Sequence, residues 1–468
     1  MSRKMKNKVI TNLLIERIAS EGKCLGHHEE KVVFVTGVAP GDVVDVRITK
    51  GKSSFMEGEP VKFHEYSKER IEPFCSHFGT CGGCKWQHIN YDLQKTYKRQ
   101  QVLDQFQRIA KVEIPEVWPT LGSEKTKYYR NKLDFTFSNK KWLTIEQIQS
   151  GEDFDRNALG FHIPKMFDKI VDVDHCYLQG NISNDVRNDL RTFALANGLT
   201  FYDIRSQVGL LRNLIIRTTS TDQSMVIVQF GEDDADGIQK VMEFLHEKFP
   251  QITSLLYVIN TKGNETFHDL DLVTFAGNDF IEEEMEGLKF RIGPKSFYQT
   301  NSEQAYELYK VARDFADLQG DEVVYDLYTG TGTIANFVAK KAKQVIGIEY
   351  VPAAIEDAKI NSQINGIENT LFYAGDMKDM LNEDFIANHA APDLIITDPP
   401  RAGMDEKVVQ MLLRLNAPKI VYVSCNPATQ ARDVALLGEK YKVEKIQPVD
   451  MFPQTYHVEN VVLLTLKS

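Results

Sequence analysis

Little in this chain marks it for a membrane or for an oxidising compartment. Its 468 residues contain only six cysteines, too few for a disulfide-stapled scaffold of this length. No apolar run approaches the roughly 20 residues that a membrane-spanning helix needs. The first eight residues carry basic side chains, and the segment 9–16 that follows is too short and too polar for the apolar region of a secretory signal. We therefore expect a cytoplasmic protein without membrane contact.

The chain also lacks a uniform charge. Its net charge of −11 argues against a protein that is coated with nucleic acid on all sides. Residues 1–130 nevertheless hold 22 lysines and arginines against 16 aspartates and glutamates, whereas the remainder holds 33 against 50. A basic first part fits RNA contact on one side, and an ordinary solvated surface explains the same balance equally well.

Short β-type runs fill residues 1–66. They cover 9–18, 32–35 and 43–48, with turn residues between them. This spacing predicts a small Greek-key barrel. Four aromatic side chains could stack RNA bases, although we favour the barrel core for most of them: Phe34, Phe55, Phe63 and Tyr66. The segment from Phe34 to Asp42 resembles the TRAM domain, an OB-like RNA-binding module of tRNA- and rRNA-modifying enzymes.

Three cysteines, Cys75, Cys81 and Cys84, lie within ten residues, and Gly82 and Gly83 allow a tight turn between them. Zinc or an iron–sulfur cluster would each want a fourth ligand. We choose Cys176, at the end of a β-type run, because Cys24 is expected in a barrel turn. A structural zinc site that includes His77 or His175 is the alternative. With no flavin motif and no radical-type cysteine spacing, we expect a structural or substrate-positioning role.

The middle of the chain, 67–290, predicts a helix at 91–110 and a mainly antiparallel sheet with one or two helices. The predicted strands are 132–137, 158–161, 214–217, 225–230 and 255–259. Tyr128 to Lys132 is a basic and aromatic patch that could hold phosphate or stack a base, or be a solvated strand edge. The acidic run 282–286 is interpreted as a charged linker or turn.

Strand and helix patterns alternate in 291–468, which predicts a doubly wound α/β sheet. The expected strands are 323–327, 344–348, 370–373, 394–397, 420–424 and 461–466, and the expected helices are 334–341, 353–365 and 408–415. We therefore predict three domains: an OB-like barrel at 1–66, a central α+β domain at 67–290 and a Rossmann-like domain at 291–468.

Gly330 and Gly332 follow a predicted strand and precede a predicted helix, so the backbone there can approach a ligand closely. The third glycine of a dinucleotide motif is absent from this turn. Glu349 ends the next strand about twenty residues on, where an acid accepts ribose hydroxyls. Asp376, after the third strand, could receive an adenine amine. One nucleoside without a pyrophosphate cradle indicates S-adenosylmethionine rather than NAD.

Two more strand ends carry reactive or rigid groups. The strand 420–424 ends at Cys425, which puts a thiol where α/β sheets place their ligands. A lone cysteine is more often a small buried hydrophobe, but the neighbouring strand end Asp398-Pro-Pro reverses that preference. Glu459 precedes the apolar closing strand, so burial could raise its pKa toward that of a general base. Taken alone, Glu459 would be interpreted as a surface acid.

Four patterns together resemble the RNA uracil-5 methyltransferase family, most closely its iron–sulfur 23S rRNA branch with an N-terminal TRAM domain. They are the three-cysteine run, Phe297-Tyr-Gln-Thr-Asn301, Asp398-Pro-Pro-Arg401, and Ser424-Cys-Asn-Pro427 with His457-Val-Glu459. They span nearly the whole chain in the family's order. The resemblance implies that Cys425 is the nucleophile and Glu459 the base. It also implies an S-adenosylmethionine site of Gln299, Tyr328, Glu349, Asp376 and Asp398, and a [4Fe-4S] cluster on Cys75, Cys81, Cys84 and Cys176. Thr333 departs from the asparagine expected in that loop.

The implied reaction is methyl transfer from S-adenosylmethionine to carbon 5 of a uridine in RNA, with 23S rRNA as the expected substrate and a monomer as the expected state. Carbon 5 is a poor nucleophile until a thiolate adds to carbon 6, and the base must first leave its stack. Phe297 is hypothesised to stack near the vacated site or on the target base. Transfer RNA is the alternative substrate. A cytosine-5 enzyme is disfavoured by the Asp398-Pro-Pro turn, and a non-catalytic RNA-binding iron–sulfur protein by Cys425 and Glu459.

Overall fold

The computed structural model describes residues 7–467 and divides into two compact units. Of the described residues, unit 1 holds 7–79, 83–124 and 398–467, and unit 2 holds 80–82 and 125–397. The chain thus passes from one unit to the other and back. The three-domain division stays a prediction.

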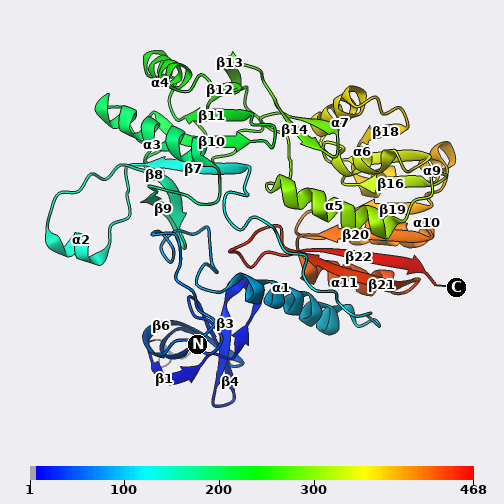
Figure 1. The fold of residues 1–468 in the computed structure, drawn as a ribbon, viewed down its shortest axis with the longest axis horizontal. Helices are drawn as coiled ribbons and strands as arrows, with labels where there is room; N and C mark the ends of the chain where they lie inside the picture. Colours follow the sequence, from blue (N-terminus) through cyan, green and yellow to red (C-terminus); the bar gives the residue numbers. More distant parts are fainter. Residues whose placement is uncertain (1–6, 468) are drawn as a thin grey trace. The chain divides into compact units, whose positions relative to one another are not determined.

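A six-stranded sheet begins unit 1, in the order β1-β5-β6-β4-β3-β2 (Figure 1). Its strands are β1 (Val9–Leu14), β2 (Arg17–Ile18), β3 (Cys24–His28), β4 (Lys31–Val35), β5 (Val43–Gly51) and β6 (Phe55–Glu65). Along β5 the side chains of Val44, Val46 and Ile48 are buried in turn, as the two-residue period of a half-buried strand requires. The predicted run of short strands is confirmed.

Two expectations for this sheet were wrong. Cys24 is the first residue of β3 rather than part of a turn, and its buried thiol donates to the Val38 carbonyl at 3.1 Å. Of the four aromatic side chains, Phe63 is partly buried and packs against the buried core, whereas Phe34, Phe55 and Tyr66 are not part of it. Phe34 lies between the inward-facing Val33 and Val35, so the alternation of the strand turns its ring outward.

Helix α1 (Tyr91–Gln105) continues into a π-helical turn, Phe106–Ala110, so the helix predicted at 91–110 is confirmed. The side chain of Asn90 caps it by accepting from the Leu93 amide at 2.9 Å. Its buried face is not the apolar stripe that periodicity suggests, because Gln94 and Lys98 are buried beside Val102.

The rest of unit 1 follows Asp398. Strands β20 (Lys419–Ser424), β22 (Glu459–Leu466) and β21 (Tyr441–Val449) pair antiparallel in that order. Helices α10 (Glu406–Leu415) and α11 (Pro427–Leu437) accompany them. Pro427 ends the strand segment and takes the first turn of α11, where its missing N–H costs nothing.

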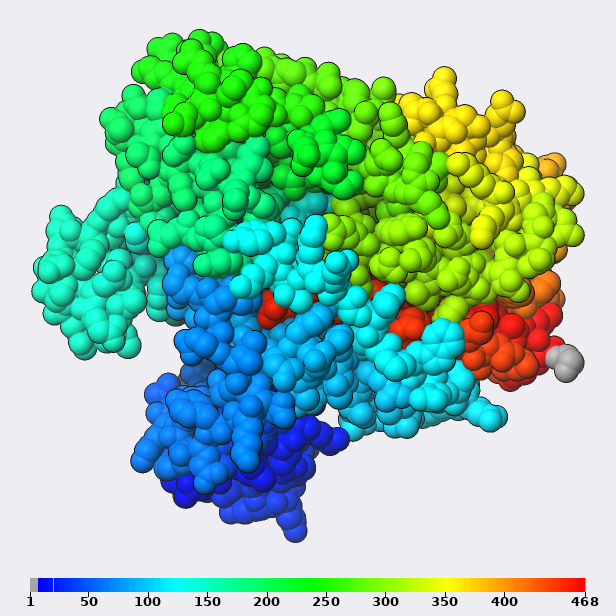
Figure 2. All heavy atoms as spheres, viewed as in Figure 1, coloured from blue at the N-terminus to red at the C-terminus, as the bar shows by residue number. Residues whose placement is uncertain are grey.

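Unit 2 contains a seven-stranded sheet in the order β13-β12-β11-β10-β7-β8-β9, with α3 and α4 beside it (Figure 1). Neighbouring strands are antiparallel, except that β11 and β12 are parallel. The predicted mainly antiparallel sheet is confirmed. The strands are β7 (Lys132–Ser138), β8 (Ala158–Ile163), β9 (Met166–Asp172), β10 (Leu211–Thr218), β11 (Ser224–Phe230), β12 (Ser254–Ile259) and β13 (Val273–Gly277). The helices are α2 (Ile145–Ser150), α3 (Asn181–Ala196) and α4 (Ala235–Lys248). Figure 2 shows α2 and its flanking residues as teal spheres that stand out from the rest of unit 2.

The acidic run 282–286 is not the predicted linker but part of a hairpin, β14 (Ile281–Met285) with β15 (Leu288–Ile292). Ile281, Glu283 and Met285 are buried in alternation. The Glu283 carboxylate accepts from the Ser220 amide at 2.9 Å, so its burial is compensated. The acidic composition of 282–286 therefore concealed a strand from the sequence analysis. Its inward face contains one carboxylate, Glu283, which is hydrogen-bonded.

Four parallel strands complete unit 2 in the order β18-β17-β16-β19. They are β16 (Val323–Leu327), β17 (Gln344–Glu349), β18 (Thr370–Ala374) and β19 (Leu394–Thr397). The helices around them are α5 (Ser302–Ala316), α6 (Thr333–Ala339), α7 (Pro352–Ile364), α8 (Met377–Met380) and α9 (Glu383–His389). Every strand predicted here is present, and the alternation with helices confirms the doubly wound pattern. Across residues 7–467, no helix combines the length and apolarity that spanning a membrane would take.

Candidate active site

The turn after β16 has the backbone shape that its glycines allow. Gly330 and Gly332 have positive φ angles of 55° and 72°, and Tyr328, a residue type that rarely does so, has 62°. A Cβ at Gly332 would lie 2.9 Å from the Ala358 Cβ and 3.0 Å from the Phe372 ring, whereas at Gly330 it would meet nothing within 4 Å. Close packing therefore requires glycine at position 332, and backbone conformation alone favours it at 330.

Glu349 and the glycine turn are brought together, as the sequence predicted. Strands β16 and β17 are parallel, with Leu327 opposite Ile348, so their carboxyl ends lie side by side. The Glu349 carboxylate accepts from the Gly330 amide at 3.2 Å and from the Val351 amide at 3.0 Å. A single carboxylate thus fixes the turn and faces the edge where parallel sheets bind ligands.

Asp326, the fourth residue of β16, is a buried acid that the sequence analysis missed. Burial, and then the charge of Glu349, raise its pKa to about 7, against hydrogen bonds that include one from the Thr329 hydroxyl at 2.5 Å. A carboxyl group inside an apolar β run was the available signal. Its ionisation near neutral pH would change the charge directly beneath the glycine turn.

Two further predicted cofactor residues also lie in unit 2. Gln299 is buried in the loop before α5, and its carbonyl accepts from the Asn131 side chain at 2.8 Å. Asp376 follows β18 and caps α8, and its carboxylate pairs with Lys378 at 2.8 Å. Asp398, the fifth predicted cofactor residue, belongs to unit 1.

Cys425 and Glu459 meet at one end of a strand pair in unit 1. Ser424, the last residue of β20, is paired with Asn460 of the antiparallel β22. Cys425 and Glu459 are the next residues outward on each chain, so they occupy the same end. The Cys425 side chain is partly exposed, whereas Glu459 is only 4% exposed. A pair separated by 34 positions in the sequence is thereby made adjacent through register alone.

Burial and neighbouring acids hold both groups in their protonated forms. Burial, and then Asp398, raise the pKa of Glu459 to about 8, and Arg401 opposes this rise. Burial, Glu459 and Asp398 raise the pKa of Cys425 to about 11, again opposed by Arg401. The raised pKa that the sequence analysis anticipated for Glu459 is confirmed. The thiol requires a nearby proton acceptor or added positive charge before it becomes nucleophilic.

Arg401 was given no role from the sequence, although it stands in the quoted Asp398 motif. Its carbonyl accepts from the Asn426 side chain at 3.0 Å and from the Thr429 hydroxyl at 3.2 Å. These bonds tie the Asp398–Arg401 segment to the turn that follows Cys425. The backbone of Arg401, whose charge lowers the pKa values of Cys425 and Glu459, is therefore held by the residues next to the thiol.

The buried Asp433 anchors the same segment from α11. It accepts from the Tyr422 hydroxyl at 2.6 Å and from the Met404 amide at 2.9 Å. Gly403, at φ 78°, passes so close that a Cβ would lie 2.7 Å from an Asp433 oxygen. Glycine at 403 is thus a condition for bringing this loop against the helix.

The segment before Glu459 is held by α1. Lys98 and Asp450, both fully buried, form an ion pair at 2.5 Å, and Lys98 also donates to the Phe452 carbonyl at 3.1 Å. Gln94 and Gln454 exchange two hydrogen bonds, with the Gln94 amide donating at 3.0 Å and the Gln454 backbone amide donating at 2.9 Å. Two polar residues of one helix therefore set the path of the chain into β22.

The structure of residues 7–467 does not show the predicted metal centre. Cys75 and Cys84 belong to unit 1, whereas Cys81 and Cys176 belong to unit 2. Between residues 7 and 467 no group of three or more His, Cys, Asp or Glu side chains is arranged to hold a metal ion, and none of the six cysteines forms a disulfide. The [4Fe-4S] cluster and the zinc alternative therefore stay predictions.

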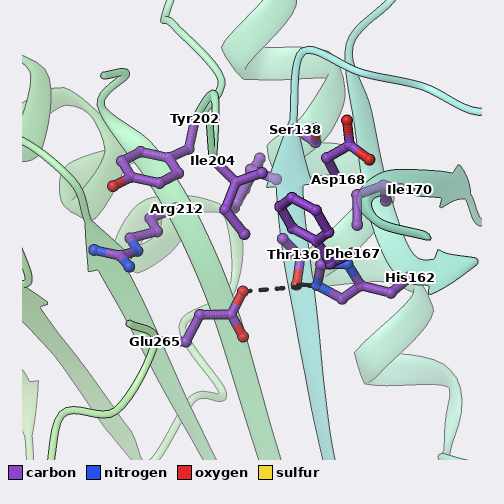
Figure 3. A pocket seen from close by; sticks show the side chains of 11 residues that line it. Thr136, Ser138, His162, Phe167, Asp168, Ile170, Tyr202, Ile204, Arg212 and Glu265 are labelled. Carbon is purple, nitrogen blue, oxygen red and sulfur yellow. Dashed lines mark hydrogen bonds and ion pairs between the residues drawn. The ribbon is translucent and has the colours of Figure 1, made fainter. Parts of the chain in front are cut away.

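A separate small pocket lies on the central sheet of unit 2, and no predicted site residue lines it. Figure 3 shows dashed lines from His162 to Thr136 and Glu265, at distances of 3.3 Å to the threonine hydroxyl and 3.6 Å to the carboxylate. Arg212, also on its wall, donates to the backbone carbonyls of Asn260 and Lys262. These contacts stabilise the loop that covers the sheet.

Comparisons with known proteins match both ends of the chain. The TRAM domain model matches residues 3–61, and the model described as tRNA (Uracil-5-)-methyltransferase matches 273–467. A relative from Bacteroides thetaiotaomicron, described as an uncharacterized RNA methyltransferase, is 58% identical over 96% of this chain and 100% of its own length. One from Chlorobaculum tepidum with the same description is 40% identical over 97% and 95%. The crystal structure of Pyrococcus abyssi tRNA (uracil-54, C5)-methyltransferase with S-adenosyl-L-homocysteine is similar with a TM-score of 0.75 and 28% identity, covering 97% of this chain and 100% of that one.

Proposed function

The chain belongs to the RNA (uracil-5-)-methyltransferase family and is an S-adenosylmethionine-dependent RNA methyltransferase, and we propose that it methylates carbon 5 of a uridine in 23S rRNA through a covalent adduct with Cys425. The observation that carries this proposal is the placement of Cys425 and Glu459 at the same end of the β20–β22 pair. A nucleophile and a proton acceptor are thereby available to one substrate ring.

Five residues would hold the cofactor. Tyr328 and Glu349 flank the glycine turn, whose close backbone approach fits a nucleoside, and Gln299, Asp376 and Asp398 are proposed to complete the site. Bound S-adenosylmethionine supplies a methyl group on a positively charged sulfur. Because Glu349 also accepts from the Gly330 amide, it would orient the turn and the ribose together.

Cys425 is proposed to begin the reaction by bonding to carbon 6 of the uracil. Its proton must first pass to solvent water, which can reach the partly exposed side chain, and the pKa of about 11 places the resting enzyme in the thiol form. Arg401 lowers this pKa, and its charge would stabilise the thiolate as it forms. The new S–C6 bond moves electron density to carbon 5, which then takes the methyl group.

Glu459 is proposed to end the reaction by removing the remaining proton from carbon 5. The electrons of that C–H bond re-form the C5–C6 double bond and expel the Cys425 sulfur. A carboxyl group with a pKa of about 8 is a stronger base, once ionised, than an ordinary glutamate. Burial that raises the pKa thus serves proton removal from carbon.

The RNA would be bound in part by the TRAM domain and would present an unpaired or extruded uridine, as reaction inside a closed site requires. Phe297, whose ring is 68% exposed, stays the candidate for stacking on the target base or in its vacated place. We propose that the enzyme acts as a monomer in the cytoplasm.

None of the steps proposed above is assigned to the [4Fe-4S] cluster that the resemblance implies. Its presence stays a prediction from the resemblance of the Cys75 segment. Iron analysis of protein purified without oxygen tests it, with about four irons per chain expected for a cubane cluster.

Adduct formation tests the mechanism. RNA that contains 5-fluorouridine cannot lose a proton from carbon 5, so wild-type protein with S-adenosylmethionine should be trapped as a covalent complex through Cys425. The Cys425→Ala variant should bind RNA and form none, and the Glu459→Gln variant should accumulate an adduct with ordinary RNA. Peptide mapping that found the bond at another residue would overturn the assignment.

Transfer RNA is the second candidate substrate, since the structurally similar P. abyssi enzyme is described as a tRNA methyltransferase. The two substrates are separated by mapping 5-methyluridine in ribosomal and transfer RNA from cells with and without the gene. Loss of the modification from 23S rRNA alone supports the proposal, and loss from tRNA alone would replace it.

A further inference from the structure

A group of basic side chains in unit 2 surrounds the loop that leads to Gln299. Lys132 of β7 is directly opposite Arg217 of β10, so both side chains lie on one face of the sheet. The Arg217 guanidinium donates to the carbonyl of Ser296 at 2.8 Å. Lys295 is the neighbouring residue on that loop and is exposed. Three cations from three segments are thereby brought around one short loop.

The positive charge here exceeds its compensation. Arg217 is only 7% exposed, its Nε is buried without a hydrogen-bond partner among the described residues, and burial lowers its pKa to about 10. The Asp134 carboxylate, which is 56% exposed, forms an ion pair with Lys132 at 3.4 Å. Its charge raises the pKa values of both Arg217 and Lys132. Like charges opposite each other on paired strands are destabilising, so a bound anion would relieve the repulsion.

Burial and the same positive charges lower the pKa of a histidine, His268. Burial, and then the charges of Lys132, Lys295 and Arg217, lower the pKa of His268. Asp269 opposes this shift, but its carboxylate is engaged by Lys262 at 2.5 Å. A neutral imidazole can still donate one hydrogen bond to an anion beside it.

We propose that Lys132 and Lys295, with Arg217 beneath them, form a binding site for a phosphate group of the substrate RNA backbone. This inference rests on the proposed function, because RNA is the polyanion that the enzyme must hold. A phosphate contact fixes the register of the strand without reading its sequence. Since Ser296 and Gln299 share one loop, the site would align the RNA with the proposed cofactor-binding segment.

The salt dependence of RNA binding tests the site. Full-length protein is titrated into a labelled single-stranded RNA that contains uridine, and log K is plotted against log salt. Each lost phosphate contact should reduce the slope by about 0.7, which is about fivefold in affinity at about 0.1 M salt. Lys132→Gln combined with Lys295→Gln should show this loss. Lys240→Gln, on the exposed side of α4, is the matched control and should leave the slope unchanged.

An unchanged slope in the folded double variant would overturn the site. If that variant does not fold, Lys295→Gln alone decides, because its side chain is exposed and its removal leaves no buried charge. Formation of 5-methyluridine by the wild-type protein is measured in parallel. Normal methylation with an unchanged slope refutes the phosphate site alone, whereas a reduced slope without any methylation refutes the proposed function alone.

Discussion

Replacing Glu459 with glutamine should make the protein more stable at alkaline pH, and by an amount that depends on pH. The carboxyl group is buried, and its pKa is about 8 in the folded protein against an ordinary value of 4.5. A pKa difference of about 3.5 corresponds to about 5 kcal/mol, at about 1.36 kcal/mol for each pKa unit.

The direction follows from proton binding. Between pH 4.5 and pH 8 the folded protein keeps a proton on Glu459 that the unfolded chain releases, so wild-type stability falls as the pH rises. Below pH 4.5 both states are protonated and the cost is absent. Above pH 8 the cost is complete. Glutamine does not ionise, so the Glu459→Gln variant avoids the penalty throughout.

Urea unfolding of both proteins across that range measures the effect, since contributions of titrating groups that Glu459 does not influence cancel in the difference between them. The stability of Glu459→Gln relative to wild type should rise by about 5 kcal/mol from pH 4.5 to above pH 8. Glu439→Gln, at an exposed position in the same unit, should give a constant difference. A constant difference for Glu459→Gln would show that the carboxyl group is not desolvated, and the proposed base would lose its physical support.

Three further outcomes are expected. Lys98→Met should lower the free energy of unfolding in urea by about 3–5 kcal/mol, because it leaves the buried Asp450 carboxylate without its cation. A change below about 1 kcal/mol would contradict the buried ion pair. Arg401→Gln should shift the pH profile of kcat/KM to higher pH, since this arginine lowers the pKa of Glu459; an unmoved profile would remove it from the site. Gly332→Ala should lower the Tm more than Gly330→Ala, because steric contact adds to backbone strain of about 1–2 kcal/mol; equal losses would refute the packing account.

The strands of the α/β part were predictable because their sequences are short, apolar and rich in β-branched residues. The strand 420–424 and the turn at Pro427 follow from local chemistry alone. The adjacency of Cys425 and Glu459 does not, since it depends on the register of β20 with β22. Resemblance to a family supplied what the spacing of the residues could not.

Other features escaped because their signals depend on distant partners. From the sequence alone, Lys98 would be interpreted as a solvated helix residue, because its partner Asp450 is 352 positions away. Strand β21 was overlooked because Lys442 and Glu444 break its apolar pattern. Arg401 stood in a quoted motif, but its effect on two pKa values is a property of spatial proximity.

The contacts of Gln454 have a consequence for the cysteine segment. Its carbonyl accepts from the backbone amides of Lys85 at 2.8 Å and Trp86 at 3.0 Å, immediately after Cys84. Glu459 follows Gln454 by five residues in the sequence. A change in the backbone after Cys84, such as one caused by alkylation of its sulfur, would therefore act on the segment that leads to Glu459, the proposed proton acceptor.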